Sequence, residues 1–281
     1  SDLAILLALT ACTSSDDNPV KPQPEPRTVL VGLEFRNKYP AGPSMEVYTY
    51  DADYRLVNMK EIEVGTGDVL ADLDYIYTPG HITKKGRDLF YDITDECTLD
   101  DQGRIVEYHH KNVKIETGQL LSDYLYTYTY DENGYIATTH SGDYVETYIW
   151  EGDELRTITM AEGNAYTTYD FEPSDAPAQA LFNRFGYNLP ELCLQGRFGV
   201  LPAHMPAKVT SAAYIDGTML FTSVTEFTTT TDDDGHLGTV STGNTTFVLH
   251  WGQQLSKFSL CVLASLRFFD ILRQTDKICR I

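Results

Sequence analysis

Basic residues are scarce in this sequence. Its 281 residues include 21 Lys and Arg against 41 Asp and Glu, so the formal net charge is −20. A protein that binds nucleic acid needs clustered Lys and Arg to neutralise the phosphates, and we therefore expect no nucleic-acid partner. The excess of negative charge is typical of a secreted protein whose charged surface keeps it soluble.

The sequence also lacks the common motifs of catalysis and metal binding. The five cysteines are Cys12, Cys97, Cys193, Cys261 and Cys279. None of them forms a C-x-x-C pair, which argues against a zinc ribbon or a thioredoxin-like site. H-E-x-x-H and G-x-S-x-G do not occur, and the acidic turns lack the alternating carboxylates of a calcium loop. We expect no catalytic residue, no metal site and no cofactor.

His109 and His110 are the most suggestive pair of ligand-type residues. Neighbouring residues of a strand point to opposite faces of the sheet, so the two rings cannot bind one metal without a bulge. We expect one of them to face the interior and the other to face solvent.

Long hydrophobic runs are missing before the final residues. The run 3–9 is too short to span a bilayer, and it ends in Leu9-Thr10-Ala11-Cys12, which resembles the lipobox of bacterial lipoproteins. The alternative, a buried element that ends in a chance cysteine, is disfavoured because residues 13–27 are polar, acidic and rich in proline. The resemblance predicts a truncated signal peptide over residues 1–11, lipidation of Cys12 and a disordered tether over 12–27.

The acidic residues that follow Cys12 resemble the surface-export signal of Bacteroides-type lipoproteins. This resemblance implies attachment to the outer membrane, with the lipid bilayer as a partner through the anchor and with exposure at the cell surface.

Helical periodicity is rare, and alternation of period two prevails. Residues 121–140 predict one antiparallel hairpin: Tyr124, Tyr126, Tyr128 and Tyr130 share a face, while Leu125, Thr127 and Thr129 share the other. Asp131 and Gly134 predict a type I turn closed by a bulge, with positive φ at the glycine.

Related turns recur along the chain. Asp100 to Gly103 and Asp232 to Gly235 repeat the Asp-x-x-Gly pattern, and in a degenerate copy Tyr54 replaces the glycine after Asp51. We expect Tyr54 to require a different turn. Strands at short spacing with such turns predict an all-β fold, an antiparallel meander of hairpins that forms a curved sheet or open barrel. We expect a single domain over residues 28–252, with one short helix over Ala176–Phe185.

The tyrosine stripe on residues 124–130 has two interpretations. Exposed aromatic rings can stack on sugar rings or grip a peptide, which would make these four tyrosines a binding surface. Alternatively the stripe is the core face of a curved sheet, and we favour the core interpretation.

The order of the motifs resembles a Bacteroides lipoprotein family, the domain of unknown function 4595. The motifs are the lipobox, the Tyr-x-Tyr-Asp hairpins, the insertion around Asn183 to Pro190, the stretch Met205 to Val209 and the closing hairpin Asp232 to Trp251. The resemblance covers roughly Thr28 to Gly252 and implies no catalytic residues.

Residues 253–281 depart from this pattern because they are apolar and basic. They fit a helix packed on the sheet, an interfacial helix or a reading-frame artefact.

The sequence thus predicts a non-enzymatic envelope lipoprotein that binds a glycan, a peptide or a protein. The alternatives are a carboxylate-dependent glycan hydrolase and a structural subunit of a surface assembly.

Overall fold

A computed structural model of the chain describes residues 27–36, 42–178, 192, 195–243 and 245–253. These residues form seventeen strands and no complete helix. The strands are β1 (Thr28–Arg36), β2 (Ser44–Tyr50), β3 (Leu56–Glu63), β4 (Val69–Thr78), β5 (His81–Asp88), β6 (Tyr91–Leu99), β7 (Ile105–Lys114), β8 (Leu120–Tyr130), β9 (Ile136–Ser141), β10 (Tyr144–Glu151), β11 (Glu154–Glu162), β12 (Ala165–Pro177), β13 (His204–Ile215), β14 (Thr218–Glu226), β15 (Thr228–Thr231), β16 (Leu237–Thr242) and β17 (Thr245–Gln253).

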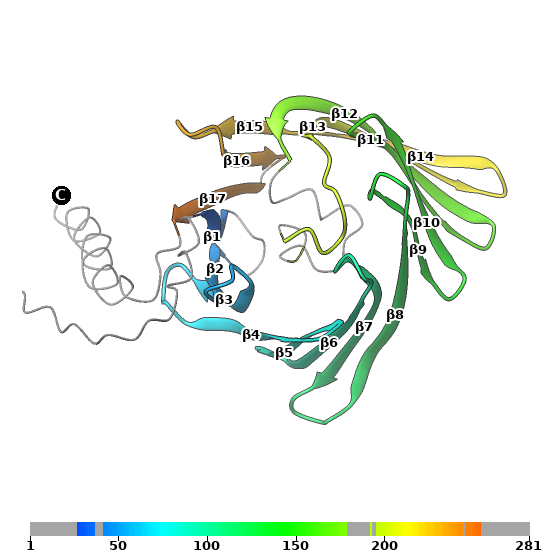
Figure 1. The fold of residues 1–281 in the computed structure, drawn as a ribbon. Coiled ribbons are helices and arrows are strands. Elements are labelled where there is room, and N and C mark those ends of the chain that lie inside the picture. The colour runs from blue at the N-terminus through cyan, green and yellow to red at the C-terminus, as the bar shows by residue number, and fades with distance from the viewer. Residues whose placement is uncertain (1–26, 37–41, 179–191, 193–194, 244, 254–281) are drawn as a thin grey trace, which may run out of the picture.

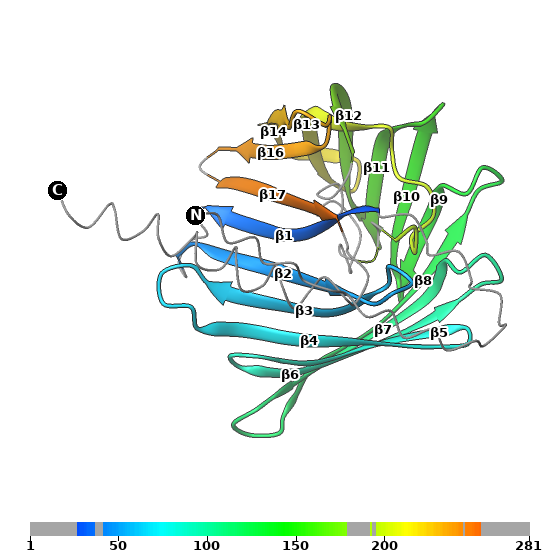
Figure 2. The ribbon, with the colours of Figure 1, turned by 60° about the vertical axis from the view of Figure 1, so that its left-hand side comes forward.

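The strands form one antiparallel sheet that is nearly closed and barrel-like (Figure 1). Each strand from β1 to β13 pairs with the next, β15 pairs with β16 and β16 with β17. Strand β17 then returns to pair with β1, from Thr28 opposite Gln253 to Arg36 opposite Thr246 (Figure 2). The predicted all-β meander is confirmed.

The sheet stays open at one place. Strands β14 and β15 follow each other around Phe227, whose amide donates to the Ala207 carbonyl at 2.8 Å. Strand β14 pairs with β13, whereas β15 pairs with β16, and the described residues show no ladder between β14 and β15. Among the described residues, one edge of β14 is therefore left without a neighbouring strand.

The Asp-x-x-Gly turns form as the sequence predicts. Gly134 donates its amide to the Asp131 carbonyl at 3.1 Å and has a φ of +87°. The Asp131 carboxylate accepts the amides of Asn133 and Tyr135, each at 2.9 Å. The side chain thus completes the turn that the backbone begins.

The expectation for Tyr54 is wrong. Its amide donates to the Asp51 carbonyl at 3.1 Å, and its φ is +61°. The Asp51 carboxylate accepts the amides of Asp53 and Arg55, as Asp131 does in the β8–β9 turn. The turn is therefore the same, and a tyrosine takes the left-handed position that suits glycine.

One other expectation needs correction. The predicted helix Ala176–Phe185 is wrong at its start, since Ala176 and Pro177 belong to β12. The rest of that segment, from residue 179, lies outside the described residues, as do residues 1–26 with Cys12 and the tail from residue 254.

A segment between β12 and β13 closes one end of the sheet. The Arg197 carbonyl accepts the Ile105 amide at 2.6 Å, and Val200 and Ala203 donate their amides to the carbonyls of Gly134 and Asp153 at 3.0 and 2.9 Å. Phe198 is fully buried and packs edge-on against Tyr128, with ring centroids 5.2 Å apart. The segment therefore ties the β6–β7, β8–β9 and β10–β11 turns together at this end of the sheet.

Among the described residues, no helix is long and apolar enough to cross a membrane.

Candidate functional site

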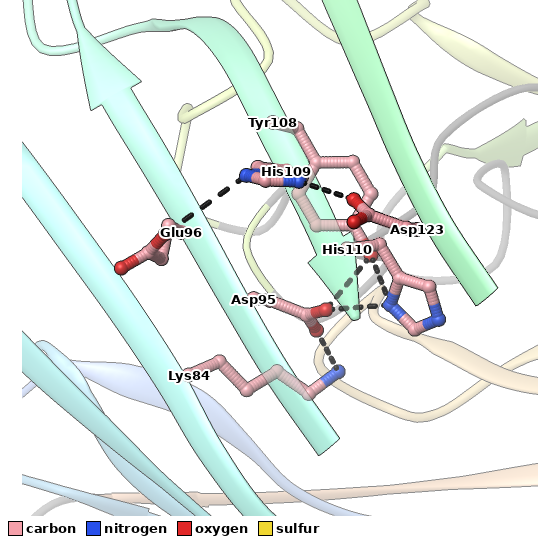
Figure 3. Close-up of polar contacts among 7 residues, drawn as sticks. All are labelled: Lys84, Asp95, Glu96, Tyr108, His109, His110 and Asp123. Atoms are coloured by element: carbon pink, nitrogen blue, oxygen red, sulfur yellow. Dashed lines mark hydrogen bonds and ion pairs between the residues drawn. The ribbon is translucent and has the colours of Figure 1, made fainter. Parts of the chain in front are cut away.

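Four side chains lie in one row on the inner face of the sheet. The strand register places Asp95 of β6 opposite His110 of β7, and His110 opposite Tyr124 of β8. Lys84 of β5 faces Asp95 in the same row. Tyr108, two residues before His110, shares this inner face and is buried. Figure 3 shows Lys84, Asp95, Tyr108 and His110 together with the outward-facing contacts of His109.

Asp95 is the centre of this row, since its side chain is only 1% exposed. A buried carboxylate is costly unless it is paired and hydrogen-bonded. His110 Nδ1 lies 2.6 Å from Asp95 Oδ1, the Tyr108 hydroxyl donates to the same oxygen at 3.2 Å, and Lys84 Nζ lies 3.4 Å from Oδ2. Both carboxylate oxygens therefore have polar partners.

The Asp95 carboxylate also orients the His110 ring. With a proton on Nδ1 donated to Asp95, a neutral His110 presents Nε2 as an acceptor. Figure 3 shows the second ring nitrogen pointing away from Asp95, and the side chain is 21% exposed. The ring lies parallel to Tyr124, with an interplanar angle of 5° and centroids 6.1 Å apart. The pair thus offers an aromatic face beside a hydrogen-bond acceptor.

His109 points to the other face, as predicted from the alternation. Its Nε2 lies 2.5 Å from Asp123 Oδ1, and its Nδ1 lies 4.0 Å from Glu96 Oε2. The two histidines therefore have separate partners on opposite faces. Within the described part of the chain, no group of three His, Cys, Asp or Glu residues could hold a metal ion.

The tyrosine stripe of β8 changes character along its length. Tyr128 is buried at 3% exposure, whereas Tyr124 is 50% exposed. Tyr126 and Tyr130 are half-buried, and the Tyr130 hydroxyl donates to the Ile105 carbonyl at 2.6 Å. Thr127 and Thr129 are on the opposite face, as expected from the alternation. The stripe therefore belongs to the core at the closed end of the sheet and is available to solvent at the other end.

A second inner carboxylate lies on β10. Glu146 is buried and accepts hydrogen bonds from the hydroxyls of Tyr144 and Tyr148, at 2.6 and 2.5 Å. Burial, and then the hydrogen bond to Glu146, raise the pKa of Tyr144. Burial likewise raises the pKa of Tyr126, with a further contribution from the charge of Glu146. These phenols stay protonated and act as hydrogen-bond donors.

Two polar atoms next to the His110–Tyr124 row have no partner in the described structure. They are Asn112 Oδ1 and Ser122 Oγ, both buried. Asn112 and Ser122 are directly opposite each other on β7 and β8, one step beyond His110 and Tyr124. These two side chains are polar groups on the inner face that the described contacts leave unsatisfied.

Another pair of carboxylates lies on β2 and β3. Glu46 is opposite Glu61 in the register, and their alternation with the buried Ser44, Tyr48 and Met59 places both on the inner face. The Ser44 hydroxyl donates to Glu61 at 2.6 Å, and the Tyr48 hydroxyl donates to Glu46. Side chains directly opposite in a sheet have Cβ atoms about 5 Å apart, so these two carboxylates are close neighbours.

Comparison with known proteins identifies the fold. No family model matches the chain, and no curated protein matches it in sequence. A porin-like protein from Bacteroides uniformis matches with a TM-score of 0.56 and 13% identity, over 80% of this chain and 98% of that chain. A porin-like protein from Bacteroides vulgatus matches with a TM-score of 0.57 and 12% identity, over 80% and 99%. The likeness is one of fold.

Sequence reasoning found the tyrosines but missed the row that includes Asp95 and Lys84. These residues lie on strands whose pairing register cannot be read from the sequence. The alternation of His110 and Tyr108 on one face of a strand was the available signal.

Proposed function

We propose that the protein is a lipid-anchored envelope protein that binds a neutral glycan on the inner face of its sheet. The observation that carries this proposal is the half-exposed ring of Tyr124, held parallel to a His110 ring that Asp95 orients. A fixed aromatic face with hydrogen-bonding groups beside it suits a sugar, which has apolar C–H faces and hydroxyl edges.

The surrounding side chains fit the same ligand class. His110 Nε2 is an acceptor for sugar hydroxyls, and the protonated Tyr126 is a donor. The net charge of −20 disfavours an anionic polymer. A neutral glycan therefore fits the row better than a nucleic acid or a polyanionic sugar does.

The outer face of the sheet supports attachment through an anchor and exposure to water. Exposed ionisable side chains on the outward positions of β5 to β7 are Lys85, Arg87, Asp92, Glu96 and Glu107. Strands that face lipid carry apolar side chains at such positions. The lipobox-like Leu9 to Cys12 supplies a different attachment, and the fold is shared with porin-like proteins of Bacteroides.

The anchor is tested by fractionation of cells that express Cys12→Ser. The wild-type protein should sediment with outer membranes and take up radioactive palmitate, whereas the variant should be soluble and unlabelled. A membrane-bound, unlabelled wild type would remove the lipid anchor from the proposal.

Ligand binding is tested with the purified chain on arrays that carry neutral glycans, acidic glycans and peptides. We expect signal on neutral glycans and its loss in Tyr124→Ala. Signal only on peptides would contradict the glycan proposal. Signal on glycans that Tyr124→Ala retains would place the site elsewhere.

Glycan hydrolysis is the second candidate, and the Glu46–Glu61 pair favours it. Retaining glycosidases hold their two carboxyl groups about 5 Å apart, a spacing within reach of cross-strand neighbours. Incubation of array-positive glycans with wild type and Glu61→Gln separates the candidates. Shorter products with the wild type alone would establish hydrolysis. Unchanged glycans with both proteins would leave binding as the function.

A further inference from the structure

Strand β14 is exposed along almost its whole length. Eight of its nine residues are exposed, and it pairs only with β13 among the described strands. Figure 1 shows it in yellow, in a hairpin with β13 whose tip lies beside the tip of the β11–β12 hairpin. Its second edge presents backbone donors and acceptors that no described strand covers.

The side chains of β14 do not protect this edge. Met219, Leu220, Phe221 and Val224 are each more than half exposed, and the other residues between Asp216 and Glu226 carry no charge. Natural edge strands avoid association through lysine, proline or inward charges. None of these occurs from Gly217 to Thr225. The composition of β14 is therefore that of a strand with a neighbouring strand on each edge.

We infer that β14 of one copy pairs antiparallel with β14 of a second copy, which makes the protein a two-fold dimer. An antiparallel pair of identical strands is self-complementary about a two-fold axis. With the axis at Thr222, the middle residue of β14, Val224 comes beside Leu220 of the second copy, at the point where β14 bulges against β13. Each copy then brings an apolar residue next to an apolar partner.

Charge supports a second copy as the occupant. A chain with net charge −20 repels its own copies over most of its surface. In the Thr222-centred register no two carboxylates are opposite each other, because Glu226 meets Thr218 and the residues between them are neutral. The neutral strand is thus a place where two acidic molecules can come into contact. This dimer is independent of the proposed glycan site.

Sedimentation of the full chain tests the dimer. The wild type should sediment with twice the chain mass of 31.6 kDa at micromolar concentration. Val224→Lys and Phe221→Lys, which place a charge on the exposed strand, should sediment as monomers with unchanged circular dichroism. The matched control is Val69→Lys on a distant hairpin, where the valine is similarly exposed at 50%, and it should stay dimeric. A monomeric wild type, or dimers that both strand variants retain, would overturn the inference.

Crosslinking tests the position of the axis. Only a residue on the axis lies opposite its own copy, within the Cα separation that a disulfide spans. Thr222→Cys should therefore form a disulfide-linked dimer with oxidised glutathione, which takes up the two electrons and the two thiol protons and leaves as two reduced glutathione molecules. Thr218→Cys, at the end of the strand, should crosslink no more than the wild type with its own cysteines. Equal crosslinking of the two variants would contradict the Thr222-centred pair.

Discussion

Tyr54 holds, at a φ of +61°, the turn position that Gly134 holds at +87° in the β8–β9 hairpin. A residue with a Cβ atom pays about 1–2 kcal/mol for the left-handed conformation. Because the Tyr54 ring also contacts the Arg27 guanidinium, the strain is best isolated by comparing two variants that both lack the ring. We predict that Tyr54→Gly is about 1 kcal/mol more stable than Tyr54→Ala, as measured by urea unfolding.

The same comparison at an ordinary turn position provides the control. Asp53 has no positive φ, and there Asp53→Gly should not be more stable than Asp53→Ala. Equal unfolding midpoints for the two Tyr54 variants would remove the assignment of strain to this turn.

Gly199 makes the closest approach in the segment that closes the sheet. A methyl group there would lie 2.2 Å from the Gly134 carbonyl oxygen, which also accepts the Val200 amide. Gly235 has nearly the same φ, +83° against +79°, and a methyl group on it would have no neighbouring atom within 4 Å. Gly199→Ala should therefore lower the free energy of unfolding by at least about 1 kcal/mol more than Gly235→Ala. Thermal unfolding of both variants measures the difference. Equal losses of stability would mean that the segment around Gly199 makes room for the methyl group at no cost in free energy.

The tyrosines of β8 should differ in their contribution to stability. Tyr128→Ala removes a fully packed ring and should cost about 3–5 kcal/mol. Tyr124→Ala removes a half-exposed ring and should cost less than about 1 kcal/mol, as should Thr127→Ala on the outer face. Urea unfolding of the three variants measures the gradient. A large loss in Tyr124→Ala would show that its ring is needed for folding and would weaken its assignment as a ligand platform.

His204 and Glu154 should make stability depend on pH. The hydrogen bond and charge of Glu154 raise the pKa of His204 above its usual value. The stabilisation is therefore complete below about pH 6.5, the usual histidine pKa, and is lost as pH rises through the higher folded value. The side chain is 43% exposed, so the effect should stay below about 1 kcal/mol. His204→Gln should narrow the stability gap between pH 6 and pH 8.5, and an unchanged gap would exclude this pair as its source.

The local structure was predictable where the chemistry is local. Asp131 and Gly134 fix their turn through bonds within five residues, and the alternation on β8 places Tyr128 inside and Thr127 outside. The β5–β6 turn was not predictable, because Leu89 and Phe90 are apolar residues that rarely form turns. Ala176 favours a helix on its own, but pairing of β12 with β13 keeps it in the sheet.

The site could not be predicted, because it depends on strand pairing between residues that are distant in the sequence. Asp95 and His110 are paired by the β6–β7 register, which the Asp100 turn and its bulge set. Each residue alone has no signal for a site, since acidic residues are abundant along the chain. Closure of the sheet between β1 and β17 likewise joins residues more than two hundred positions apart.

The affinity of the protein for its array-positive neutral glycan, measured by isothermal titration, decides whether the inner face is the binding site. The matched pair of variants is Tyr124→Ala on the inner face and Tyr166→Ala on the outer face, where Tyr166 stacks on Tyr214 at 4.6 Å. We predict that Tyr124→Ala raises Kd by at least about tenfold, or roughly 1.4 kcal/mol, while Tyr166→Ala leaves it unchanged. An unchanged Kd in Tyr124→Ala, with weaker binding in Tyr166→Ala, would contradict an inner-face glycan site.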